Sequence, residues 1–197
     1  MYSEVRANEM LPLRISQGMR RWLAVLLLFS FQYSASAFTV KSAETSLVDG
    51  VYVLDLNIDY VFSQQMVEAL HRGVKITVVL DLEFLRKREY WWDERVTALQ
   101  QRYELRFHAL SQQYILSNLN SGVQHNFPGL NAALAVMGTV VGVPVLDRHL
   151  LEEGERYWVR LRARVDVDAL PIPLRLRSLV SSSWDLESEW FSWELAL

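Results

Sequence analysis

Val74–Phe84, with the sequence VKITVVLDLEF, is the stretch that decides the fold. Apolar side chains occupy every second position from Val74 to Phe84, and polar ones such as Lys75 and Asp81 occupy most positions between them. Successive side chains of a strand point to opposite faces, so this alternation predicts one face on a core and one in water. Segments 53–61 and 156–168 alternate in the same way, which indicates an antiparallel sheet covered on one side.

Turn and cap signals lie on the N-terminal side of this strand. Asp49-Gly50 predicts a hairpin between an extended segment, 38–47, and the strand that follows it. Ser63 and Gly73 are residue types that cap helices, and they frame a short predicted helix over the residues between them.

The segments on the C-terminal side are less regular. The alternation of the strand expected at 95–109 changes phase at Leu110, which predicts either a β-bulge or a strand that crosses between sheets. We expect a loop at 118–126 and an irregular edge strand at 139–146. Between them, Pro128–Met137 is a second predicted helix, with Gly138 after its end.

These patterns predict an all-β antiparallel sandwich of about seven or eight strands with two short helices. It forms a single domain, 38–197, with an aromatic-rich C-terminal segment. Pro171 and Pro173 predict a stiff segment that ends the last clear strand. The periodicity of Trp184–Trp193 fits either a strand or a helix.

The first 37 residues have the pattern of an export signal. Arg20-Arg21 precede an apolar run, Trp22–Phe31, and Ala35-Ser36-Ala37 is a small-residue cleavage site. We expect cleavage after Ala37 and a periplasmic protein; either Met19 is the true start or the charged region is simply long. The alternatives are a leader retained as an inner-membrane anchor, although its apolar run is shorter than the ~20 residues that span a bilayer, or a buried N-terminal helix.

Composition excludes several function classes. The chain has 197 residues, 51% of them hydrophobic, with a net charge of −3 and no cysteine. The absence of a basic excess argues against a nucleic-acid binder, and a chain without cysteine has no disulfide or thiolate site. No histidine pair has metal-site spacing and no phosphate-binding glycine motif occurs, so we expect no metal site, no cofactor and no catalytic residues. The alternating Asp55, Asn57 and Asp59 could bind Ca²⁺ weakly, but a solvated strand face explains them better.

Three arginines form the first candidate interaction surface. Arg160, Arg162 and Arg164 alternate with apolar residues and therefore project from one face of a strand. They either pair with acidic residues of a neighbouring strand, such as Asp81 and Glu83, or form a docking stripe for an anionic partner.

Aromatic residues form the second candidate surface, in two clusters. They are Tyr90, Trp91 and Trp92 in one cluster and Trp184, Trp190 and Trp193 in the other. Tryptophans of this kind serve cores, protein interfaces or membrane–water interfaces.

Four fragments together resemble a known family. They are REYWWDERV at 88–96, ELRFHALSQQYIL at 104–116, FPGLNAAL at 127–134 and PIPLRLRSLVSSSWDLESEWFSW at 171–193. Nearly the whole mature chain resembles a proteobacterial family of small secreted proteins that is known only as a domain of unknown function. The resemblance implies export and genes that often lie near a sensor kinase of the nitrogen-regulation type, and it supplies no catalytic residues to transfer to this chain.

The function predicted from all these observations is a non-catalytic periplasmic binding or adaptor module. Its partner is an envelope protein or the anionic membrane surface, and its oligomeric state is open. The alternatives are a membrane-anchored accessory protein and an enzyme that uses a loop histidine.

Overall fold

The structure, a computed structural model, describes residues 38–88, 92–178, 183–184 and 186–196. The strands are β1 (Phe38–Val48), β2 (Val51–Tyr60), β3 (Ile76–Arg86), β4 (Glu94–His108), β5 (Gln113–Asn118), β6 (Gln124–Phe127), β7 (Thr139–Asp147), β8 (Tyr157–Val165) and β9 (Phe191–Glu194). The helices are α2 (Gln64–His71), α3 (Leu130–Gly138) and α4 (Ile172–Ser178), with 3₁₀ turns at Arg148–Leu150 and Val167–Ala169.

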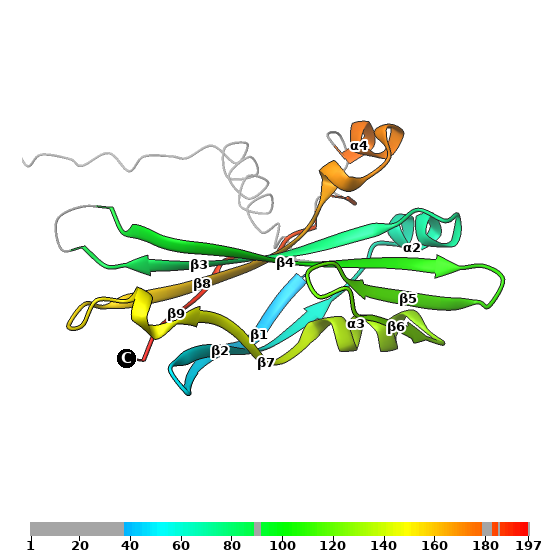
Figure 1. Cartoon of the computed structure of the whole chain (residues 1–197). Coiled ribbons are helices and arrows are strands. Elements are labelled where there is room, and N and C mark those ends of the chain that lie inside the picture. The colour runs from blue at the N-terminus through cyan, green and yellow to red at the C-terminus, as the bar shows by residue number, and fades with distance from the viewer. Residues whose placement is uncertain (1–37, 89–91, 179–182, 185, 197) are drawn as a thin grey trace, which may run out of the picture. The chain divides into compact units, whose positions relative to one another are not determined.

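The described strands form two antiparallel sheets. The strand order is β1-β2-β7 in the smaller sheet and β6-β5-β4-β3-β8-β9 in the larger one, which lie in two layers (Figure 1). Apolar side chains of both sheets share one core. The predicted all-β antiparallel sandwich is therefore confirmed, with nine strands and three α-helices in the described part of the chain instead of seven or eight strands and two helices.

The central strand β3 differs from its prediction in one respect. Leu80, on the inner face, is buried as expected. The expectation that the other face lies in water is wrong, because Thr77, Val79 and Asp81 are only 6%, 0% and 9% exposed. β3 lies between β4 and β8, whose long polar side chains extend over this outer face and bond to the acidic groups of β3.

The local turn and cap signals are confirmed. Asp49 and Gly50 have φ values of 50° and 83°, which the tight β1–β2 hairpin requires. The Ser63 side chain accepts a hydrogen bond from the Met66 backbone N–H at the start of α2, and Gly73 follows the helix with a φ of 84°.

Both explanations of the phase change near Leu110 are wrong. Residues 109–112 form a hairpin turn within the larger sheet, and Gln112 has a φ of 52°. Phe107 pairs with Tyr114 across this turn. Paired residues point to the same face, so an even number of intervening residues changes the sequence parity without a bulge.

Three other segments depart from the expected structure. The predicted loop at 118–126 contains most of β6, because His125 and its neighbours pair with β5. The segment after Pro171 is a helix, α4. Pro173 is compatible with α4 because it lies in the first helical turn, where a backbone N–H has no partner within the helix. Part of the ambiguous tail is the strand β9, which pairs with β8.

Helix α3 connects β6 of one sheet to β7 of the other (Figure 1). It begins at Leu130, two residues later than predicted, and Gly138 is its last residue rather than the residue after it. A Cβ at Gly138 would lie 2.1 Å from the backbone oxygen of Ile58 on β2. Glycine is therefore needed there for the close approach of the helix to the smaller sheet.

Candidate functional site

The three arginines of β8 lie on the outer face of the larger sheet, and each is bonded to a carboxylate. Arg160 Nε donates to Glu83 at 2.7 Å, and Arg164 Nε donates to Asp81 at 2.8 Å. Arg162 lies 3.4 Å from Asp81 and bonds also to Glu187 at 3.2 Å. Cross-strand pairing, one of the two alternatives for this row, is thus present in the structure.

Other neighbouring residues also hold the side chains of these arginines in place. The ring of Trp190 stacks against the guanidinium groups of Arg160 and Arg162, with distances of 4.5 and 4.7 Å from ring centroid to Cζ. Burial raises the pKa of Asp81, but hydrogen bonds from Arg164 and Gln100 and the arginine charges outweigh burial and lower it overall. A docking stripe requires guanidinium groups that are free to bind a partner, whereas these guanidinium groups already form ion pairs with carboxylates of the same chain. Docking by this row stays a prediction.

The aromatic candidates are separated in the structure. Trp184 is a core residue at 4% exposure, and Trp193 Nε1 donates to Thr45 Oγ1 at 3.1 Å, which joins β9 to β1. Trp92 is 93% exposed. Tyr90 and Trp91 lie outside the described residues. No single aromatic surface therefore unites the described members of the two clusters.

The histidines are dispersed as well. His71 forms a hydrogen bond of 2.6 Å with the Tyr114 hydroxyl, and His108 forms one of 2.9 Å with Ser111. Within the described ranges, no group of three histidine or acidic side chains is placed to hold a metal ion. None of the helices in the described ranges has the length and apolarity needed to cross a bilayer.

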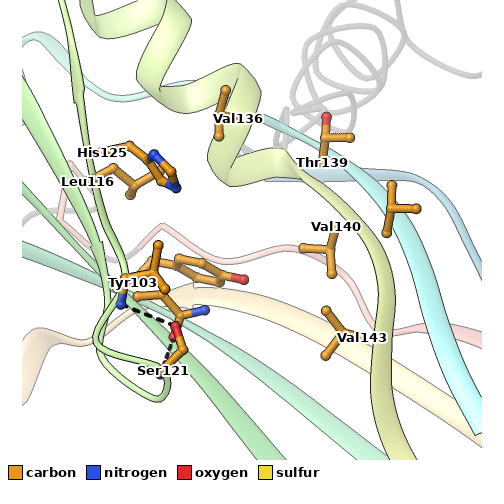
Figure 2. Close-up of a pocket in the computed structure, with 11 residues that line it drawn as sticks. Tyr103, Leu116, Ser121, His125, Val136, Thr139, Val140 and Val143 are labelled. Atoms are coloured by element: carbon orange, nitrogen blue, oxygen red, sulfur yellow. Dashed lines mark hydrogen bonds between the residues drawn. The ribbon is translucent and has the colours of Figure 1, made fainter.

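The sequence did not predict a pocket of about 520 Å³ at one side of the sandwich (Figure 2). One side of the pocket is formed by α3 and by β7, the edge strand of the smaller sheet. The other side is formed by β4, β5 and β6 of the larger sheet. The lining residues of the pocket are Tyr103, Leu116, Asn118, Ser121, Val123, His125, Val136, Thr139, Val140, Val141 and Val143. A pocket of this size is within the range of small-molecule sites.

The polar groups of the pocket are mostly neutral. Tyr103 projects from β4 toward Val140 and Val143 (Figure 2), and burial raises the pKa of its hydroxyl, which therefore stays protonated. Asn118 Oδ1 accepts hydrogen bonds from the backbone N–H groups of Asn120 and Ser121, at 2.9 and 3.1 Å. This loop is thereby held at the rim of the pocket.

One sequence signal could have pointed to the pocket. In residues 139–146, valines occupy neighbouring positions, such as Val140 and Val141, and therefore point to opposite faces of the strand. Only one of these faces packs on the core. Val140 is 8% exposed, whereas Val141 is 75% exposed. Surplus valines on an irregular edge strand therefore indicated an apolar surface outside the core.

The family model for a domain of unknown function, DUF4390, matches residues 35–194. The chain belongs to this family. The match confirms the family resemblance of the four fragments; the proteobacterial origin and the gene neighbourhood stay predictions. Comparison of this DUF4390 chain with curated proteins and with solved structures found no match.

Proposed function

We propose that this DUF4390 protein is an exported, non-catalytic binding module of the cell envelope that works in the periplasm. The observation that carries the proposal is the pocket of about 520 Å³ between β7 and the β4–β6 region, which is open to solvent and lined by valines and by polar groups that, in the described part of the chain, include no carboxylate. Pockets that combine an apolar lining with a few hydrogen-bonding groups hold ligands in a defined orientation.

The position of the domain supports export. The expected cleavage after Ala37 falls immediately before β1, whose first residue, Phe38, is fully buried. The Phe38 ring packs edge-on against Tyr60 at a centroid distance of 4.9 Å. Removal of the leader would leave the described β-domain whole.

The lining of the pocket favours binding over chemistry. Among the described residues that line it, His125 and Tyr103 are the ionisable ones, and no carboxylate accompanies them. Acid–base catalysis uses an ionisable group that a further group orients, whereas burial keeps the Tyr103 hydroxyl protonated and no carboxylate of the described residues lines the pocket to orient His125. These two side chains can still orient a guest by hydrogen bonds.

Native mass spectrometry of the protein isolated from its own cell envelope tests the proposal. We expect Phe38 as the N-terminal residue and a non-covalently bound small molecule that survives gentle purification. Val136→Trp should remove that molecule, because Val136 is 47% exposed at the pocket and a larger side chain there fills it. Val61→Trp is the matched control, at a 62% exposed valine that does not line the pocket. An intact leader in a protein that carries no guest would contradict the proposal.

A further inference from the structure

The two walls of the pocket differ in polarity. Figure 2 shows Val136, Val140 and Val143 along α3 and β7, facing Leu116 and the ring of Tyr103 across the space. On the side of the larger sheet, Figure 2 shows two hydrogen-bonding residues, Ser121 on the loop and His125 on β6, with the Tyr103 ring between them. A guest that matches both parts needs an apolar portion and a polar end.

The apolar wall continues inward between the sheets. A small void of about 20 Å³ shares Tyr103, Val140 and Val143 with the pocket. Most of its other lining residues are leucines of both sheets, namely Leu54, Leu56, Leu80, Leu82, Leu99 and Leu161. A void of this size has room for little more than one water molecule or methylene group. The leucines therefore extend the apolar surface behind Tyr103 but do not form a channel, and an aliphatic chain has to be held by the pocket itself.

The edge strand β7 is poorly suited to bind an extended peptide. Gly142 has a φ of 64°, the β2–β7 register shifts on both sides of Leu54, and Pro144 has no N–H to donate. Peptides that add to a sheet edge need an unbroken row of backbone donors and acceptors, and bulges and prolines remove it. The guest is therefore held by contacts with the apolar wall and not by backbone hydrogen bonds to β7.

We propose that the pocket binds a single-chain fatty-acyl amphiphile, with its aliphatic tail against the valines and the Tyr103 ring and its polar head at the rim formed by Asn118 and Ser121. The Asn118 Oδ1 atom is occupied by backbone N–H groups, so its side-chain NH₂ is left to donate. The Ser121 hydroxyl can also donate to the oxygens of a head group at this rim. This assignment rests on the proposed binding function and names the chemical class of its guest.

A homologous series of saturated fatty acids, each competing with a fluorescent fatty acid for the purified mature protein, tests the assignment. Every methylene that enters the apolar part should tighten the dissociation constant about fourfold, until the tail fills the space and the affinity levels off. Val136→Trp and Val141→Trp should each weaken binding of the longer chains at least tenfold, whereas Val61→Trp should not change it. Val136 and Val141 are exposed, so thermal melts should show that both variants are folded.

Two results would overturn the assignment. Dissociation constants that do not depend on chain length would show that the tail is not buried, and unchanged binding in both pocket variants would place the fatty acid elsewhere. If the fatty acids fail but a molecule from the envelope still co-purifies with wild type and not with Val136→Trp, the amphiphile is wrong and the binding function stands. If no guest is found in either experiment, both proposals fail.

Discussion

Asp81 is the residue whose replacement tests the charge network most directly. Its carboxylate accepts hydrogen bonds from Gln100 at 2.7 Å and from Arg164 at 2.8 Å, and it lies 3.4 Å from Arg162. Asp81→Asn keeps the size of the side chain but removes the charge. The guanidinium groups of Arg162 and Arg164 then lie beside each other on a largely covered sheet face, and no carboxylate at position 81 neutralises them.

The expected loss of stability follows from the burial of the pair. Removing one partner of a buried ion pair costs about 3–5 kcal/mol, and an exposed pair contributes about 0–1 kcal/mol. The side chains of Asp81, Arg162 and Arg164 are 12%, 28% and 29% exposed, so they lie between these limits. We expect Asp81→Asn to lower the free energy of unfolding by about 2–3 kcal/mol, which corresponds to a melting temperature lower by about 4–12 °C.

Thermal melts over a range of pH provide the assay. The pKa of Asp81 is lowered from its usual 3.8 in the folded state, so its stabilising contribution is present above pH 3.8 and is lost as the pH falls through the folded-state value. The difference between wild type and Asp81→Asn should therefore shrink below pH 3.8. Asp59→Asn is the control: its pair with Lys41 is 57% and 56% exposed, and the loss should stay below about 1 kcal/mol. Equal melting temperatures for wild type and Asp81→Asn at neutral pH would refute the reasoning.

Three further substitutions test the packing and the arginine row. Leu80→Ala should cost about 2–5 kcal/mol in urea titrations, because Leu80 is 2% exposed, and a much smaller loss would mean that this position is poorly packed. Gly138→Ala should cost about 1–3 kcal/mol, because its Cβ meets Ile58, and an unchanged melting temperature would contradict that contact. Replacing both Arg162 and Arg164 by Ser should lower the melting temperature, since both bond to Asp81. Weaker binding to anionic vesicles at an unchanged melting temperature would instead support the docking stripe.

The predictions that depend only on residues close together in the sequence were the accurate ones. The Asp49-Gly50 hairpin and the Ser63 cap depend on backbone dihedrals and short hydrogen bonds within a few residues. The turn before β5 was missed for a related reason: hairpin turns and bulges both change the sequence parity, and nothing local distinguishes them at Leu110. The helix α4 was missed because proline in a first turn and proline in an extended segment have the same local signature.

The candidate surfaces were harder to predict, because side chains that face the same way can have different neighbours. Alternation placed Arg160, Arg162 and Arg164 on one face correctly. It left open whether carboxylates or solvent would meet them, and the structure supplies Asp81 and Glu83 from β3.

The sequence by itself determined the strand periodicity, the Asp49-Gly50 hairpin and the caps of α2, because these depend on contacts over a few residues. It also indicated the antiparallel class, through strands with one apolar face. Only the tertiary structure decided that β3 is central and covered on both faces, and that Trp184 lies in the core. It also brought Tyr103 of β4 and Val140 of β7 to opposite sides of one pocket. The physical reason is that strand order and sheet packing join residues far apart in the chain, and amphipathic periodicity specifies which face is apolar without specifying what will cover it.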